Sequence, residues 1–150
     1  MRLFGTGHRE LEHPEALLRE EIKKTLLEAE PELVIVGMAS GFDLILGDTA
    51  REMSVPYACV RPWRGHWPRQ KDENLYMAVW NFASETYSTT EDDDYPGAWV
   101  YQKRNEQMID MATHGIAYFS GKVGGTANAI EYSHSQKKRV RNIFDRIPPF

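Results

Sequence analysis

Short apolar runs alternate with amphipathic stretches along this chain, and that alternation constrains the fold more than any other feature. The run Leu33-Val34-Ile35-Val36 is continuous and β-branched, as expected of a strand that is covered on both faces. In the stretch before it, Leu18, Ile22 and Leu26 recur at helical spacing among charged residues. Strands that alternate with helices favour a parallel sheet, because each crossover needs a helix to return the chain. We therefore expect one α/β domain over residues 1–150, with a mainly parallel sheet flanked by helices.

The boundaries of these elements follow from the same patterns and from the Gly, Pro and Asp residues between them. Strands are predicted at 1–5, 33–36, 57–60, 86–89, 116–119 and 140–144, and helices at 14–29, 43–53, 68–83, 100–113 and 126–137. The run Glu91-Asp92-Asp93-Asp94-Tyr95-Pro96-Gly97 breaks the pattern and predicts a solvated loop. Clustered carboxylates suit hard cations, but the loop lacks the spacing of an EF-hand, so no metal site is predicted.

Composition limits the partners that the chain is expected to bind. Its formal net charge of −4 gives no electrostatic reason for tight binding to a nucleic-acid backbone. No apolar stretch approaches the ~18 residues that a membrane span needs, and the N-terminus lacks the pattern of a signal peptide. The single cysteine, Cys59, lies in an apolar run and cannot form an internal disulfide. We expect a soluble, cytoplasmic protein that has no membrane partner.

Three glycine motifs follow predicted strands. They are Gly5-Thr6-Gly7-His8-Arg9, Gly37-Met38-Ala39-Ser40-Gly41-Phe42-Asp43 and Gly121-Lys122-Val123-Gly124-Gly125-Thr126. In open parallel sheets, ligands bind at the carboxyl ends of the strands, where glycine turns lead into helices. Glycine lets backbone N–H groups approach an anion, and a helix N-terminus adds unpaired donors. The three motifs therefore predict a site for a ligand that carries phosphate.

These motifs match neither a Walker loop nor a dinucleotide fingerprint. The chain contains no G-x-x-x-x-G-K-[ST], and Gly5-Thr6-Gly7 lacks the third glycine of G-x-G-x-x-G. Ser40 stands one position too late for the G-x-S-x-G motif of hydrolases. We expect Ser40 to donate to a phosphate or to cap a helix, and we do not expect it to be a nucleophile.

Five segments of the chain resemble the YpsA-like branch of the SLOG superfamily. They are Thr6-Gly7-His8-Arg9, Gly37-Met38-Ala39-Ser40-Gly41-Phe42-Asp43, Gln102-Lys103-Arg104-Asn105, Met108-Ile109-Asp110 and Gly124-Gly125-Thr126. That superfamily also contains the DNA processing protein DprA and the LOG phosphoribohydrolases. The resemblance runs nearly end to end, and its motifs occur in the same order. It implies a Rossmann-like fold without the ordinary dinucleotide fingerprint, with a nucleotide or nucleotide-derivative site built from these loops.

The resemblance also implies which residues bind the ligand. The implied ligand-binding residues are Gly5, Thr6, Gly7, His8, Arg9, Gly37, Met38, Ala39, Ser40, Gly41, Asp43, Arg104, Asn105, Gly124, Gly125 and Thr126. Arg104 and Asn105 would reach in from the start of a helix, and the guanidinium of Arg104 or Arg9 would clamp a phosphate or form a surface ion pair. Asp43 would hold a ribose hydroxyl or cap its helix. His8 is interpreted either as an acid or base or as a hydrogen-bonding structural histidine.

One departure from the LOG pattern favours binding over turnover. The LOG enzymes carry P-G-G-x-G-T with a glutamate three residues beyond the threonine, whereas here Ala129 stands three residues beyond Thr126 and Glu131 stands five beyond it. We therefore expect a protein that binds a nucleotide-derived small molecule as a sensor or sequestering protein, with no required cofactor. The alternative is a nucleoside-monophosphate N-glycosidase that uses Asp43 or Glu131.

A second alternative is a module for single-stranded nucleic acid. Basic and aromatic residues gather in two places, Lys137-Lys138-Arg139 with Arg141, and Trp63, Arg64, His66, Trp67 and Arg69. Stacking beside a basic groove grips single strands, although cations also favour helix C-termini and tryptophans also pack inward. Related folds commonly form dimers, so a homodimer is left open, and the segment from Pro62 to Trp80 is a candidate cover for the pocket or dimer interface.

Overall fold

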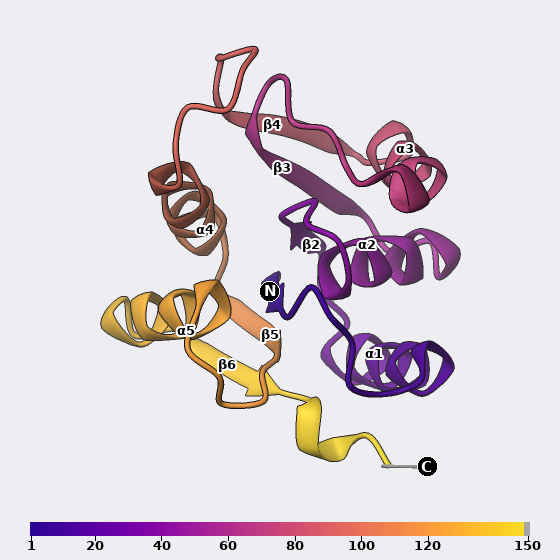
Figure 1. Ribbon diagram of the computed structural model, residues 1–150. Coiled ribbons are helices and arrows are strands. Elements are labelled where there is room, and N and C mark those ends of the chain that lie inside the picture. Colours follow the sequence, from indigo (N-terminus) through magenta and orange to yellow (C-terminus); the bar gives the residue numbers. More distant parts are fainter. Residues whose placement is uncertain (149–150) are drawn as a thin grey trace.

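The computed structural model describes residues 1–148 and shows a six-stranded parallel sheet flanked by helices (Figure 1). The strands are β1 (Arg2–Gly7), β2 (Leu33–Val36), β3 (Tyr57–Trp63), β4 (Glu85–Thr90), β5 (His114–Tyr118) and β6 (Arg139–Asn142). The helices are α1 (Glu15–Ala29), α2 (Phe42–Glu52), α3 (Glu73–Asn81), α4 (Trp99–Met111) and α5 (Gly125–Ser135), with the short 3-10 helices η1 (Gln70–Asp72) and η2 (Phe144–Arg146). The α/β class, the parallel sheet and the flanking helices are confirmed.

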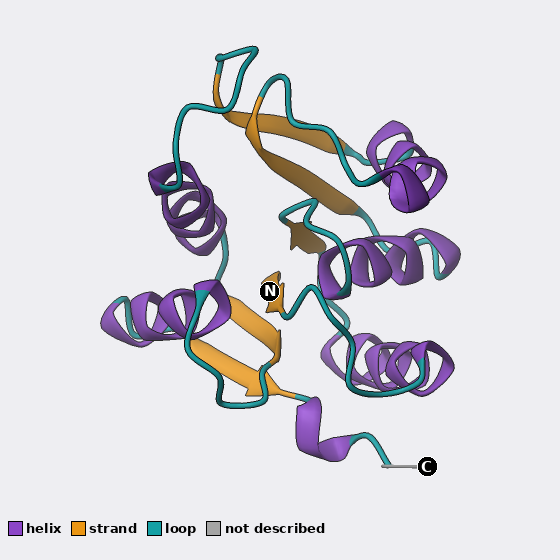
Figure 2. Cartoon of the chain, in the orientation of Figure 1, coloured by secondary structure: helices purple, strands orange, loops and turns teal. Residues whose placement is uncertain are grey.

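The order of the strands places the start of the chain at the centre of the sheet. The order is β4-β3-β2-β1-β5-β6, so β1 pairs with β2 on one side and with β5 on the other. The chain winds outward from β1 to β4 and then returns through α4 to β5. Helices α1, α2 and α3 cover one face, and α4 and α5 cover the other (Figure 2). Such a reversal between β1 and β5 opens a crevice at the carboxyl ends of these two strands.

The sheet has an apolar core on each face. Successive residues of a strand point to opposite faces, so Val34 and Val36 pack with helices α1 to α3, whereas Ile35 packs with α4 and α5. Phe4 and Ala129 also belong to the second core. No described helix has both the length and the apolar character to cross a membrane.

Strand β1 continues through Gly5-Thr6-Gly7, where the sequence had predicted a break. Gly5 and Gly7 pair with Ile116 and Tyr118 of β5. A Cβ atom on Gly5 would lie 2.1 Å from Leu46, and one on Gly7 would lie 2.5 Å from Phe42. These two glycines therefore let α2 pack closely on the strand, and they do not form a turn.

Several other predicted boundaries were also wrong, and three of them have a clear physical cause. Strand β3 extends to Trp63, because its last residues pair with β4. The helix predicted at 68–83 begins only at Glu73, since Arg69 is extended, with ψ of 150°, and η1 intervenes. The last strand ends at Asn142, whose side chain accepts from the N–H groups of Phe119 and Phe144 and so turns the chain.

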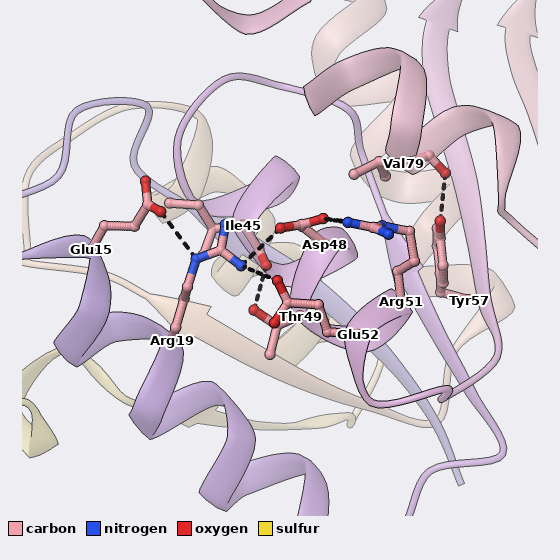
Figure 3. A network of polar contacts seen from close by, with 9 residues as sticks. All are labelled: Glu15, Arg19, Ile45, Asp48, Thr49, Arg51, Glu52, Tyr57 and Val79. Atoms are coloured by element: carbon pink, nitrogen blue, oxygen red, sulfur yellow. Dashed lines mark hydrogen bonds and ion pairs between the residues drawn. The ribbon is translucent and has the colours of Figure 1, made fainter. Parts of the chain in front are cut away.

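Helices α1 and α2 are held together by a polar network around Asp48 (Figure 3). The Asp48 carboxylate lies 2.8 Å from Arg19 Nη1 of α1 and 2.5 Å from Arg51 Nη2 of its own helix. Arg19 also pairs with Glu15 and Glu52. Burial alone would raise the pKa of Asp48, but the hydrogen bonds from Arg51 and Arg19 outweigh it and hold that pKa below its ordinary value.

We expect Asp48→Asn to lower the free energy of unfolding by about 1–3 kcal/mol at pH 7, because the two guanidinium groups lose a mostly buried carboxylate partner. A carboxyl group with a lowered pKa contributes stability above its unfolded pKa near 4. That contribution is lost as the pH falls through the folded pKa. Urea unfolding of the wild type and the variant at pH 7 and pH 3 should show a smaller difference in the free energy of unfolding at pH 3.

The matched control is Glu52→Gln, since Glu52 is 45% exposed and contacts Arg19 at 3.3 Å. Exposed pairs of this kind contribute about 0–1 kcal/mol. An equal loss of stability in the two variants would show that burial does not increase the contribution of the Asp48 ion pairs to the free energy of unfolding.

Candidate functional site

A cavity of about 470 Å³ opens at the carboxyl ends of β1 and β5, where the strand order reverses. We call it the first chamber. Most of the predicted ligand-binding residues line it, namely Gly5, Thr6, Gly7, His8, Arg9, Ala39, Asp43, Arg104, Asn105, Gly124, Gly125 and Thr126. The fold therefore gathers residues from four separate segments of the sequence around one space.

The remaining predicted residues lie beside the first chamber. Met38 and Ser40 line an adjoining second chamber of about 310 Å³. Gly41 lines a further pocket between the first loop and η1. Gly37 lines none of these three spaces, and it lies behind Asp43 and Arg104.

Arg104 is a buried cation at the wall of the first chamber. Its side chain comes from the second turn of α4, and not from a helix start as the resemblance implied. Its Nη1 donates to the carbonyl of Gly37, and its Nε donates to Asn105 Oδ1 at 2.9 Å. A Cβ on Gly37 would lie 2.9 Å from Asp43 Oδ2 and 3.1 Å from the guanidinium of Arg104. Gly37 therefore makes room for both charges.

Asp43 is a buried carboxylate on the other side of Gly37. It is the second residue of α2, which begins after Gly41 without a side-chain cap. Its Oδ2 accepts from the N–H of Ala39 at 3.2 Å in the preceding loop, so the helix-capping interpretation was wrong. Burial raises the pKa of Asp43 to about 6, although Arg104, the Ala39 N–H and Arg9 each oppose that rise.

The first chamber has more positive than negative side chains. Arg9 is exposed, its guanidinium lies 5.3 Å from the centre of the Tyr101 ring, and it forms no ion pair with residues 1–148. Lys122 lies at the rim and contacts Glu12 at 3.3 Å. Asp43 is the only carboxylate among the described residues that line the chamber. Such an excess of cations favours an anionic ligand.

The N-terminus of α5 closes the chamber on the side opposite to α2, the helix that carries Asp43. Gly124 precedes this helix with a φ of 145°, which is a backbone conformation that favours glycine. A Cβ on Gly124 or Gly125 would meet nothing within 4 Å, unlike one on Gly5 or Gly7. The first N–H groups of α5 are therefore approachable, as in anion sites at helix N-termini.

His8 holds the loop after β5 in place. Its Nε2 accepts from the N–H of Ser120 at 2.8 Å, and burial lowers the pKa of His8 below its ordinary value. The imidazole is therefore neutral at pH 7, with its Nε2 lone pair already engaged. This geometry favours the structural interpretation over a role for Nε2 as a base.

Two groups that the sequence had offered for the other functions lie outside the chamber. Glu131 is exposed on α5 and does not line it, whereas Ala129 is 1% exposed in the core. In the basic cluster, Lys138 donates to the carbonyl of Ile109 and Arg141 pairs with Glu28.

The acidic loop of residues 91–97 also lies outside the chamber. Its Asp93 pairs with Arg64. Residues 1–148 contain no group of three or more His, Cys, Asp or Glu that could hold a metal.

Sequence reasoning missed several residues that line the chamber, among them Tyr101, Gln102, Lys122 and Asn128. Gln102 stands in a segment that carried the resemblance and Lys122 stands in the third glycine motif, so their positions were the available signal. The Oε1 atom of Gln102 is buried and accepts no hydrogen bond within the described chain. Tyr101 and Asn128 gave no comparable signal, because a polar or aromatic residue on a helix is ordinarily a surface or packing residue.

No family model matches this chain, and no curated protein matches it either. Among solved structures, DNA processing protein A (DprA) from Streptococcus pneumoniae superimposes with a TM-score of 0.76 at 14% identity, over 94% of this chain and 49% of that one. DprA from Helicobacter pylori, described for its single-stranded DNA binding mode, superimposes with a TM-score of 0.74 at 15% identity, over 95% of this chain and 64% of that one. TM1055 superimposes with a TM-score of 0.64 at 19% identity, over 97% of this chain and 78% of that one.

These likenesses confirm the Rossmann-like fold that the resemblance implied. Membership of the SLOG superfamily stays a prediction. The chain spans about half the length of the Streptococcus protein and 64% of the Helicobacter protein. The identities of 14–19% concern the fold alone, and the YpsA-like branch stays a prediction.

The buried carboxylate of Asp43 predicts a pH dependence of stability. A carboxyl group whose folded pKa is raised to about 6 contributes stability that is full below its unfolded pKa near 4 and is lost as the pH rises through 6. The cost at pH 8 is on the order of 2–3 kcal/mol. We expect Asp43→Asn to remove this loss. In urea unfolding, the free energy of unfolding of the variant should therefore rise relative to that of the wild type between pH 4 and pH 8.

The control for this experiment is Glu131→Gln, which changes an exposed carboxylate outside the chamber. Its pH profile should follow that of the wild type. Parallel profiles for Asp43→Asn and the wild type would contradict the raised pKa of Asp43.

Proposed function

We propose that this protein binds a nucleotide or a nucleotide-derived small molecule that carries phosphate, in the first chamber. The observation that supports it most is the placement of an open helix N-terminus and two guanidinium groups, Arg9 and Arg104, around one cavity at the strand reversal. Parallel α/β sheets bind ligands at this position, and helix N-termini with arginine side chains suit phosphate.

The phosphate and the ribose of a nucleotide each have a suitable group in the chamber. The N–H groups at the start of α5 and the unpaired guanidinium of Arg9 suit the phosphate. Asp43, whose pKa is about 6, is mostly ionised at pH 7, so its carboxylate suits a ribose hydroxyl that donates a hydrogen bond to it. Gln102 adds a buried acceptor in the same wall. Arg104 fixes the Gly37 loop from behind and shapes the chamber.

The chemistry of the chamber favours binding over turnover. Glycoside hydrolysis ordinarily uses two carboxyl groups on opposite sides of the bond that breaks. Asp43 is the only carboxylate among the described residues of the chamber, and the position that the LOG pattern gives to glutamate is the buried Ala129. We therefore propose a sensor or sequestering protein, and the N-glycosidase is the alternative.

A binding function for single-stranded nucleic acid is the second candidate. The Helicobacter DprA structure is described for its single-stranded DNA binding mode. In this chain Trp67, Tyr95 and Trp99 are more than half exposed, as stacking platforms for bases require. The net charge of −4 and the engagement of Lys138 and Arg141 weigh against it.

We expect Arg9→Gln to weaken the binding of AMP or ADP about 10- to 100-fold, because one charge-assisted hydrogen bond to phosphate contributes about 1.5–3 kcal/mol. Calorimetry of each nucleotide with the wild type and the variant measures this loss. Adenosine, which has no phosphate, should bind both proteins weakly and equally.

The matched control is Arg139→Gln, because Arg139 is also exposed but lies at the start of β6 and lines a different pocket with Met1 and Leu3. Its affinity for nucleotides should equal that of the wild type. Equal losses in the two variants would contradict the placement of the phosphate. Free base or ribose phosphate in the recovered ligand would favour the N-glycosidase.

We expect Gly125→Ala to leave the free energy of unfolding within about 0.5 kcal/mol of the wild type, since the added methyl group meets nothing within 4 Å. The same methyl group should weaken nucleotide binding about tenfold or more, because it stands where a phosphate must approach the N–H groups of α5. Thermal denaturation and calorimetry check the two halves separately. Unchanged affinity in a stable variant would place the phosphate elsewhere.

A further inference from the structure

The second chamber adjoins the first and shares a wall with it. Arg9, Ala39, Tyr101 and Arg104 line both chambers. The second chamber lies at the carboxyl end of β3, where the segment of residues 63–69 leaves the sheet. One ligand can therefore reach from the first chamber past Arg9 and Tyr101 into the second.

The far wall of the second chamber is aromatic. The Trp63 ring lies 4.9 Å from that of His66 and 6.1 Å from that of Tyr101, both edge to face. Trp67, which is 57% exposed, lies across from Tyr76 at 5.9 Å. Trp63 is half-buried among these rings, whereas the exposed ring of Trp67 borders the second chamber. An exposed aromatic ring beside half-buried ones suits a planar ligand ring such as a base, which stacks on it.

The charges of the second chamber also suit a neutral ring that is attached to an anion. Glu10, the carboxylate in its lining, pairs with Arg69 at 3.2 Å. The Nδ1 of His66 lies 3.0 Å from the Tyr76 hydroxyl. Burial, and then the charges of Arg104, Arg9 and Arg61, lower the pKa of His66 to about 4, so the imidazole is neutral at pH 7. Apart from Arg69, which pairs with Glu10, the cations that line the second chamber are Arg9 and Arg104 of the wall that it shares with the first.

We propose that the two chambers form one site for a ligand made of two nucleosides joined by phosphate. One nucleoside and the phosphate occupy the first chamber, and the base of the second nucleoside stacks on Trp67 and Trp63 in the second. The volumes agree with this division, because about 470 Å³ and 310 Å³ each fall in the lower part of the ~300–1,000 Å³ range of small-molecule sites. The inference rests on the proposed function of the first chamber and names its ligand class.

Two sources supply this chemistry, a free dinucleotide and the end of a single strand. The first arm of the test therefore compares AMP with diadenosine diphosphate by calorimetry. The second arm compares the phosphodiester dinucleotide pApA with a longer oligoadenylate over a range of salt concentrations. A free dinucleotide predicts no gain with length. A strand end predicts affinity that rises with length and falls steeply with salt.

We expect the wild type to bind diadenosine diphosphate or pApA about tenfold or more tightly than AMP. Trp67→Ala should remove that advantage and leave the affinity for AMP unchanged, because Trp67 lines only the second chamber. Gly125→Ala, in the first chamber, should weaken both kinds of ligand. The control is Phe82→Ala, since Phe82 is 70% exposed and lines neither chamber.

A second readout does not depend on a variant. The ring protons of His66 should shift in the NMR spectrum when the dinucleoside binds and stay in place when AMP binds. Equal affinities of AMP and both dinucleosides, with an unchanged His66 signal, would overturn the two-chamber site and leave the proposed function standing. No binding of any of these ligands would overturn the proposed function as well.

Discussion

The buried guanidinium of Arg104 holds the two faces of the sheet together at the end where the site lies. It comes from α4 on one face, donates to the carbonyl of Gly37 after β2, and lies beside Asp43 of α2 from the other face. Two buried opposite charges carry a desolvation penalty that only proximity and hydrogen bonds offset. Arg104 and Asp43 each line the first chamber, so the shape of that chamber depends on this pair.

The glycines of the site fall into two physical classes, and the difference separates a packed wall from an open rim. Gly5, Gly7 and Gly37 are glycine because a side chain or a buried charge occupies the place of a Cβ. Gly124 and Gly125 have no neighbour there, and Gly124 has a positive φ. The first class fixes the position of α2 and of Arg104. The second class leaves the start of α5 open to an anion.

Much of this arrangement was predictable from sequence, because the strand periodicity and the family resemblance are both local signals. The parallel sheet and the gathering of Arg9, Asp43 and Gly125 at one edge follow from them. The break predicted at Gly5 was wrong, because Gly5 lies within strand β1 and Leu46 packs against it. From sequence alone, such a glycine cannot be distinguished from a glycine in a turn. The sequence also grouped Trp63, His66, Trp67 and Arg69, which line the second chamber. It did not predict that this chamber adjoins the first, because the contact of Trp63 with Tyr101 depends on where α4 lies.

A titration of the isotope-labelled protein with a nucleotide, followed by amide chemical shifts, locates the phosphate site directly. Binding in the first chamber predicts the largest changes at the start of α5, around Gly125 and Thr126, and in the loop of Arg9. Changes centred instead on Leu3, Val140 and Arg141, which line a pocket at the opposite edge of the sheet, would contradict it. So would a spectrum that no nucleotide perturbs.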